Sequence, residues 1–302
     1  MTDKRYTIID LGSNSFHMLT VIKTEDGFSV FSKNKQKVRL ASGLDQNNYL
    51  NQETINNGLH CLKSFREQLE QINPHKVLIT ATAALRLAVN NQQFIQQAEN
   101  ILKYPINLIS GIEEAKIIYQ GVTFTTKNKQ QMLIIDIGGA STELIIGKGK
   151  DIIKAESLHM GCVTWLKDYF PEQKLSLENF NNAIKQAKDV IQPHIKSYKK
   201  ASWKLCMGAS GTIQAIKEVN NVQQLDKSLT LELLYKIKQQ CIDSEQIQTL
   251  NIEGLEESRK PVFASGLAIL IALFECLDIE HIAPSNGALR EGLISMMFEG
   301  ES

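Results

Sequence analysis

The sequence predicts an α/β protein built from two similar domains, and three observations support this. Strand-like apolar runs alternate with helix-like segments along the chain. At 302 residues, the chain is long enough for two domains that each bury a core. One motif also occurs twice, as Ile-Ile-Asp-Leu-Gly-Ser-Asn-Ser at 8–15 and as Ile-Ile-Asp-Ile-Gly-Gly-Ala-Ser at 134–141. We therefore expect a duplicated unit, each copy offering a phosphate-binding hairpin to a shared cleft.

The chain is organised around residues 131–147, which predict a hairpin. The apolar run 132–137 indicates a buried strand, Gly138 and Gly139 a tight turn, and the apolar run 144–146 a returning strand. Because glycine has no Cβ, a ligand can approach this backbone closely, and the N–H groups of the turn can hold an anion. Two hydroxyl side chains directly after the turn can assist them.

Two carboxylates flank this turn. Asp136 lies where the first strand enters it, and Glu143 lies just past it. Carboxylates beside an anion site indicate a hard cation such as Mg²⁺ between them. The alternative interpretation is a tight hairpin with an exposed aspartate.

The N-terminal third predicts three strands, at Tyr6–Asp10, Phe16–Lys23 and 28–40. A spacing of two residues places four basic side chains on one face of the third strand; they are Lys33, Lys35, Lys37 and Arg39. They either protect a solvated sheet edge or form a basic wall for a polyphosphorylated substrate. His17, beside the first turn, is expected to pack or to form a hydrogen bond.

An amphipathic helix is predicted over 53–72, followed by strands at 76–82 and 106–109. The short helix predicted over 83–89 carries Arg86. This lone cation among apolar residues either extends its charged end to solvent or binds a phosphate.

The segment that begins at Ser110 matches a capping box, in which Glu113 reaches back to the start of the helix. Glu113 therefore has a structural role. Glu114 has none in that scheme, so it is either an acid that favours the helix dipole or a general base at the cleft.

The polar segment 123–130 is the predicted domain boundary, which gives an N-terminal domain of residues 1–124 and a C-terminal domain of residues 125–302. In the second domain we expect a strand at 151–158, helices at 163–169 and 177–198, and a strand at 203–207. The glycine turn before the helix 213–219 is a third candidate anion site; its residues are Gly208, Ser210, Gly211 and Thr212.

Residues 220–260 are expected to be mostly helical. The apolar run 262–277 is too short for a membrane span and is expected to form a core helix between the domains. Near the C-terminus, Arg290 and Glu291 are expected to form salt bridges.

Composition narrows the class of partner. The formal net charge is zero, so we expect no nucleic-acid partner. No apolar run approaches the length of a membrane span and the first ten residues have no signal-peptide core, so we expect a cytoplasmic protein without a membrane partner. The five cysteines are scattered and are expected to be buried, reduced thiols.

Seven segments together resemble the exopolyphosphatase / guanosine pentaphosphate phosphohydrolase (Ppx/GppA) family in its short, two-domain form. They are IIDLGSNSFHM, ATAALRLAVN, ISGIEEA, DIGGASTE, MGCVTWL, MGASGT and SNGALREG, in family order over essentially the whole chain. The spelling DIGGAST and the segment MGCVTWL are more similar to the guanosine pentaphosphatase branch. Asn286 stands where the family commonly has an aspartate, so any role of that position is open.

The resemblance implies two ribonuclease-H-like domains of the actin-like superfamily, with an active site in the interdomain cleft. It implies that Glu114 is the catalytic glutamate, that Asp136, Glu143 and Asp10 position Mg²⁺ or another divalent cation, and that Arg86 binds phosphate. The implied phosphate- and substrate-binding residues are Ser13, Asn14, Ser15, Gly138, Gly139, Ala140, Ser141, Thr142, Gly208, Ser210, Gly211 and Thr212.

The expected activity is removal of the terminal phosphate of pppGpp to give ppGpp, together with some activity on the ends of inorganic polyphosphate. Alternatives are a dedicated exopolyphosphatase, a kinase or ATPase of the same superfamily, and a non-catalytic binder of ppGpp or polyphosphate. A homodimer is a possible assembly.

Overall fold

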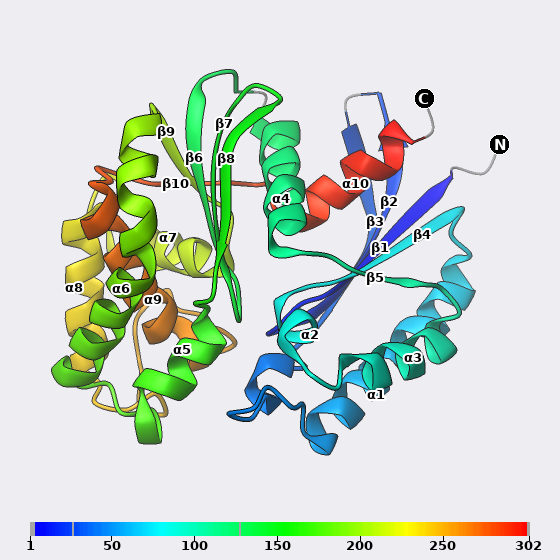
Figure 1. The fold of residues 1–302 in the computed structure, drawn as a ribbon, viewed down its shortest axis with the longest axis horizontal. Coiled ribbons are helices and arrows are strands. Elements are labelled where there is room, and N and C mark those ends of the chain that lie inside the picture. The colour runs from blue at the N-terminus through cyan, green and yellow to red at the C-terminus, as the bar shows by residue number, and fades with distance from the viewer. Residues whose placement is uncertain (1–3, 26, 127, 301–302) are drawn as a thin grey trace.

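The computed structural model consists of two lobes, each built on a five-stranded sheet (Figure 1), and it describes residues 4–25, 27–126 and 128–300. In the first sheet the strand order is β3-β2-β1-β4-β5. The first three strands are antiparallel neighbours, and β4 and β5 run parallel to β1. Their bounds are β1 Arg5–Leu11, β2 Phe16–Thr24, β3 Gly27–Gln36, β4 Lys76–Ala81 and β5 Ile106–Leu108.

The second sheet has the order β10-β9-β6-β7-β8, which is the same topology read from the other edge. Again three antiparallel strands come first, and two parallel strands follow. The bounds are β6 Gln131–Ile137, β7 Thr142–Lys148, β8 Asp151–Leu158, β9 Leu205–Gly208 and β10 Ala283–Pro284. The predicted α/β architecture of two similar domains is confirmed.

The two hairpins also agree in register. Asp10 faces His17 in the β1–β2 pair, and Asp136 faces Glu143 in the β6–β7 pair. Both members of the second pair lie 126 residues after those of the first. His17 is thus the positional counterpart of Glu143.

Ten α-helices are described, and seven of them form three groups around the sheets. Helices α1 and α3 cover the outer face of the first sheet, while α6, α8 and α9 build the core of the second lobe. Helices α4 and α10 lie between the sheets (Figure 1), where their apolar residues join side chains from both sheets in one cluster. The bounds are α1 Gln52–Ile72, α2 Ala83–Leu87, α3 Asn91–Leu102, α4 Gly111–Thr126, α5 Cys162–Tyr169, α6 Leu177–Ala201, α7 Gly211–Gln223, α8 Leu231–Asp243, α9 Lys260–Leu277 and α10 Leu289–Glu299, with short 3-10 helices η1 Leu40–Gly43 and η2 Pro171–Gln173.

Several sequence-based expectations need correction. The third strand ends at Gln36 instead of residue 40, because the chain turns there and Arg39 adopts a left-handed conformation (φ 54°). Consequently Lys37 and Arg39 lie beyond the strand. The prediction also omitted α3, and between 220 and 260 the described helices leave 224–230 and 244–259 non-helical.

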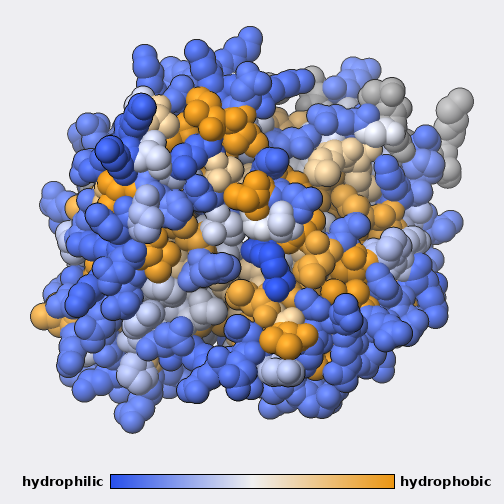
Figure 2. Space-filling model, in the orientation of Figure 1, coloured by the Kyte–Doolittle hydropathy of each residue, from blue (hydrophilic) through white to orange (hydrophobic). Residues whose placement is uncertain are grey.

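From the sequence we expected a core helix between the domains. Helix α9 instead lies inside the second lobe. Its 18 residues are long and apolar enough to cross a membrane by length and composition, so the expectation that the run was too short was also wrong. However, 83% of this window is buried inside the protein, as in a core helix. The surface is mostly hydrophilic on the face drawn in Figure 2, with apolar side chains gathered near its middle.

The predicted boundary falls at the end of α4. Residues 123–126 form its last turn, and residue 127 lies outside the described residues. Helix α10 comes from the C-terminal end of the chain, yet it packs on α4 and on β1 of the first sheet. The division at 124/125 stays a prediction.

Candidate active site

The glycine turns of the two lobes meet face to face. A Cβ added at Gly139 would lie 2.7 Å from the Cβ of Ser13 and 3.1 Å from the backbone nitrogen of Asn14. Only glycine therefore allows the second turn to approach the first this closely. Within the second turn the N–H of Gly138 donates to the carbonyl of Ser141 at 2.9 Å.

The first turn is held by its surroundings. The Ser13 hydroxyl accepts a hydrogen bond from the backbone N–H of Ala84 at 3.0 Å, at the start of α2. The carbonyl of Asn14 accepts one from the N–H of Arg39 at 2.9 Å. Both the helix that carries Arg86 and the basic segment after β3 are thus tied to this turn.

A cavity of about 270 Å³ lies between the turns. Most of the predicted site residues line it: Asp10, Ser13, Asn14, Ser15, Glu114, Asp136, Gly138, Gly139, Ser141, Glu143, Ser210, Gly211 and Thr212. These residues come from both lobes and from four separate stretches of the chain. The fold therefore brings the three predicted anion-binding turns to one place.

Four predicted site residues are not among those that line the cavity. Thr142 is fully buried and donates its hydroxyl to the carbonyl of Met160 at 2.7 Å. Ala140 packs in the core of the first lobe, and the space beside Gly208 is filled by a neighbouring isoleucine side chain. The fourth, Arg86, binds Glu114.

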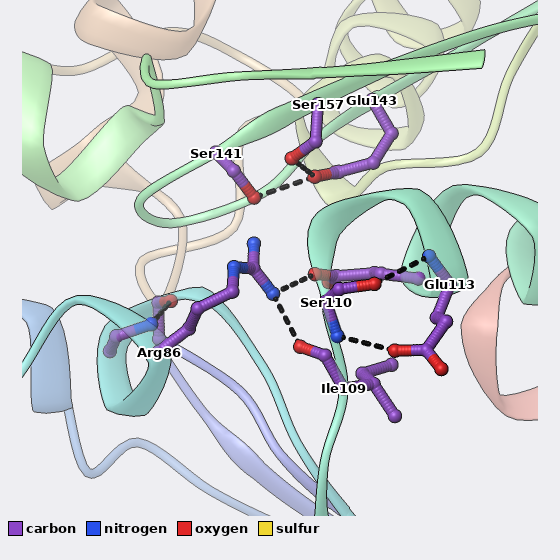
Figure 3. Close-up of polar contacts among 10 residues, drawn as sticks. Arg86, Ile109, Ser110, Glu113, Ser141, Glu143 and Ser157 are labelled. Carbon is purple, nitrogen blue, oxygen red and sulfur yellow. Dashed lines mark hydrogen bonds and ion pairs between the residues drawn. The ribbon is translucent and has the colours of Figure 1, made fainter.

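Glu114 lies in the first turn of α4 and is buried (7% exposed). Its Oε2 accepts a hydrogen bond from Nη1 of Arg86 at 3.1 Å, and the same nitrogen donates to the carbonyl of Ile109 at 3.0 Å. Figure 3 shows the rest of the guanidinium pointing toward Ser141 of the other lobe. Burial raises the pKa of Glu114, and the Arg86 charge opposes this.

The capping box at the start of α4 is present. The backbone N–H of Ser110 donates to Oε2 of Glu113 at 2.8 Å, and the N–H of Glu113 donates to the Ser110 hydroxyl at 3.2 Å (Figure 3). Glu113 is exposed, whereas Glu114 faces the cavity. The predicted capping role of Glu113 is confirmed, and the two glutamates differ in placement.

Three further carboxylates share the cavity with Glu114. Enclosure by protein raises the pKa of Asp10 to about 7 and that of Asp136 to about 7, and repulsion by the Glu114 carboxylate adds to the rise for both. The pKa of Glu143 is raised well above its usual value by burial, although its Oε1 accepts hydrogen bonds from the hydroxyls of Ser141 (2.7 Å) and Ser157 (2.8 Å). Ser157 lies opposite Glu143 on β8, a relation that the sequence alone did not indicate.

These carboxylates fit a divalent cation. Among the described residues no three His, Cys, Asp or Glu side chains form a ready-made metal cluster. Mg²⁺, however, commonly takes one or two carboxylates together with water and substrate phosphates. Asp10 Oδ1 is buried without a hydrogen-bond partner in the described part of the chain, so it is free to bind a cation. Asp10 and Asp136 are the residues that would hold it.

Several cations line the same cavity. From the sequence, Lys33 and Lys35 were either charges at a solvated sheet edge or a basic wall for a polyphosphorylated substrate, and Arg259 was given no role. Arg290 was expected to form a salt bridge together with Glu291, but its Nη1 lies 3.1 Å from Nδ1 of His17, and Glu291 instead accepts the backbone N–H of Ala288 at 2.9 Å. The sequence signal that could have found Arg290 is its place in the first turn of a helix that follows a glycine turn. The other cavity cations are Lys33, Lys35 and Arg259.

Burial and the positive charges around them lower the pKa values of both Lys35 and His17. Burial and the charge of Arg259 lower the pKa of Lys35 to about 8. Burial and the charges of Arg290, Lys35 and Lys33 lower the pKa of His17 to about 2, so His17 is neutral at physiological pH. At the start of α7, the Ser210 hydroxyl is buried with no partner among the described residues.

Two lobes of one sheet topology, with a glycine hairpin from each meeting over a cluster of carboxylates, define a two-lobed α/β protein with an acidic cavity between its lobes. A family model described as the Ppx/GppA phosphatase family matches residues 20–301. The chain belongs to this family.

A named relative and two solved structures agree with this. The chain is 51% identical over 292 residues to a protein of Pseudoalteromonas translucida named guanosine-5'-triphosphate,3'-diphosphate pyrophosphatase; the match covers 97% of this chain and 59% of that protein. The chain thus spans less than two thirds of the relative's length. The fold is similar to a crystal structure of an exopolyphosphatase from Cytophaga hutchinsonii (TM-score 0.88, 24% identity, 98% of each chain) and to a Ppx/GppA family member from Aquifex aeolicus (TM-score 0.79, 22% identity, 99% of each chain).

Proposed function

We propose that this protein is a phosphoanhydride hydrolase that removes the terminal phosphate of pppGpp to give ppGpp, and that it also acts on inorganic polyphosphate from its ends. The family and the name of the relative support this substrate class. The observation that carries the proposal is Glu114, a buried carboxylate fixed by Arg86 in a cavity lined by both glycine turns.

In the proposed reaction a water molecule attacks the terminal phosphorus. A new oxygen–phosphorus bond forms, the bond to the bridging oxygen breaks, and the electron pair leaves with the shortened nucleotide or polyphosphate. Glu114 accepts the proton of the water, a step that typically contributes about 10²–10⁴ in rate. Its ion pair with Arg86 favours the ionised, proton-accepting form against the effect of burial.

The turns hold the phosphate. The backbone N–H of Gly139 and the polar side chains of the turns are suited to stabilise the charge that develops on phosphate oxygens, while the N–H of Gly138 closes the turn on Ser141. A divalent cation held by Asp10 and Asp136 supplies charge neutralisation and orientation when it is bound. The same groups suit a polyphosphate end and a nucleoside polyphosphate, since the terminal phosphoanhydride is common to both.

Phosphate release from pppGpp, GTP and inorganic polyphosphate, measured side by side with Mg²⁺, tests the proposal. We expect release from pppGpp and polyphosphate. A preference for polyphosphate with little pppGpp turnover would favour a dedicated exopolyphosphatase. Tight pppGpp binding without turnover would favour a binder, and transfer of phosphate from ATP to an acceptor would favour a kinase. Because these substrates are metabolites of the cell interior, we also propose a cytoplasmic location.

A further inference from the structure

Arg290 is a cavity arginine without an acidic partner among the described residues. Its one described contact is the 3.1 Å approach of Nη1 to Nδ1 of His17. The neighbouring Glu291 is not available to it, because its carboxylate caps the start of α10 through the N–H of Ala288. Arg290 therefore keeps its full positive charge and most of its N–H donors for another group.

His17 is suited to aim this guanidinium. Arginine can only donate hydrogen bonds, so Nδ1 of His17 accepts and the ring is the neutral tautomer with its proton on Nε2. His17 occupies the position in the first lobe that Glu143 occupies in the second. A glutamate at this place would neutralise Arg290, whereas a neutral imidazole orients the arginine and leaves its charge unpaired.

Arg290 is also held rigidly relative to Glu114. Helices α4 and α10 touch through glycines: a Cβ at Gly121 would lie 2.0 Å from the carbonyl oxygen of Ala288, and a Cβ at Gly292 would lie 2.0 Å from that of Ile117. Glu114 is on α4 and Arg290 on α10, so the two side chains project into the cavity from one tightly packed helix pair.

Arg290 also shares its cavity with the carboxylates between the two turns. It lines the same cavity as Asp10 and Asp136. Arg86 is the arginine that the sequence predicted to bind phosphate. Its Nη1 already donates hydrogen bonds to Glu114 and to the carbonyl of Ile109. Arg290 has no comparable commitment among the described contacts.

We propose that Arg290 is a catalytic residue that donates hydrogen bonds to the transferred phosphate, and that His17 is the positioning residue that aims it. The proposal rests on the proposed hydrolase function and adds a phosphate ligand to it. A planar guanidinium can contact two phosphate oxygens at once, and a cation held in a fixed orientation stabilises charge that develops during transfer.

The first test compares Arg290→Met and Arg290→Lys with the wild type, with Mg²⁺ present throughout. We expect Arg290→Met to lower kcat by about 10²–10³-fold, and Arg290→Lys to recover only part of this loss because an ammonium lacks the fork of donors. The control is Arg66→Met, which removes an equal charge from an exposed Arg66–Glu70 pair on α1. If Arg290→Met and Arg66→Met have the same kcat, the proposal is wrong.

The second test separates aiming from simple packing. His17→Leu removes the acceptor, and His17→Asn places an amide oxygen near the position of Nδ1. We expect His17→Leu to lower kcat by about 10- to 100-fold and His17→Asn to restore most of it. In the Arg290→Met background His17→Leu should change kcat by less than about twofold, since the partner it acts through is gone. Equal, additive losses in both backgrounds would overturn the positioning role.

A binding measurement keeps this inference separate from the proposed function. Inorganic tripolyphosphate is titrated into wild type, Arg290→Met and Arg66→Met by calorimetry with Mg²⁺. Weaker binding by Arg290→Met alone supports the phosphate contact even if no variant releases phosphate, in which case only the proposed hydrolysis fails. Equal affinity in all three proteins, together with an unchanged kcat for Arg290→Met, would remove Arg290 from the site.

Discussion

The two lobes share one sheet topology and one hairpin register, yet their turns carry opposite chemistry. In the second lobe, Asp136 is opposite Glu143, which two hydroxyls hold in place. In the first lobe, Asp10 is opposite His17, which contacts Arg290. The duplicated backbone thus supplies two similar glycine turns, each with an aspartate, while side-chain divergence places a second carboxylate opposite Asp136 and a neutral imidazole, in contact with an arginine, opposite Asp10.

This difference suits a reaction at a highly charged substrate. A polyphosphate end needs cations around its oxygens, and an attacking water needs a carboxylate to accept its proton. Two identical acidic turns would repel the substrate, and two basic turns would lack a base. Glu114 lies on a helix between the sheets and belongs to neither turn; in the proposed reaction it is the base.

Removing Glu114 should have the largest effect. Glu114→Gln keeps the shape of the side chain and removes the proton acceptor, so we expect kcat to fall by about two to four decades with substrate binding retained. Steady-state assays and melting curves at saturating Mg²⁺ measure both properties. The matched variant is Glu113→Gln, the adjacent exposed residue, which should keep its kcat. A reversed result would assign the base to Glu113.

Gly139 and Ser13 are counterparts in the repeat, but substitution of each by alanine should lower the rate to a different extent. Gly139→Ala places a Cβ 2.7 Å from the Cβ of Ser13 and pushes the turns apart. A displacement of the reacting groups by about 1 Å typically lowers the rate by roughly 10²-fold. Ser13→Ala removes only the hydroxyl that accepts the N–H of Ala84, so its loss should be smaller. If Gly139→Ala were as active as wild type, the turns would not need this close contact.

Much of this comparison could be predicted from the sequence, because it depends on local patterns. The repeated Asp-x-Gly motif predicted both hairpins, and the Ser110–Glu113 spacing predicted the capping box. The role of Arg290 could not be predicted, because only the packing of α10 against the first lobe brings it to His17, 273 residues away. The end of the third strand was also missed, since it depends on the left-handed conformation of Arg39 and not on residue alternation.

Mg²⁺ should stabilise the protein more at high pH than at low pH. The ordinary pKa of an aspartate is about 3.9, whereas Asp10 and Asp136 have pKa values of about 7 in the folded protein. Between about pH 4 and 7 the folded state therefore binds extra protons, so the stability of the metal-free protein decreases as pH rises through this window. A cation bound by the ionised pair offsets the repulsion.

Melting temperatures with and without Mg²⁺, at pH 5 and pH 8, check this expectation. The Mg²⁺-dependent rise should be larger at pH 8. Asp10→Asn should raise the melting temperature of the metal-free protein at pH 8 and reduce the response to Mg²⁺. An equal response of wild type and Asp10→Asn at pH 8 would show that Asp10 does not take part in cation binding.

The smallest effect concerns the two helices between the lobes, which begin in the same way. Glu113 accepts the N–H of Ser110 at the start of α4, and Glu291 accepts that of Ala288 at the start of α10. Glu113→Ala should lower the melting temperature by about 1–3 °C, whereas Glu113→Gln keeps a capping acceptor and should lower it less.

Hydrogen bonds from Ser110 lower the pKa of Glu113. The stability that its ionised form contributes is therefore present above the unfolded pKa and is lost as pH falls through the folded pKa. The difference between wild type and Glu113→Gln should therefore shrink below about pH 4. Glu291→Ala should cause a similar melting change but also lower kcat, because Arg290 precedes it directly. If neither alanine variant has a lower melting temperature than wild type, the caps do not stabilise these helices.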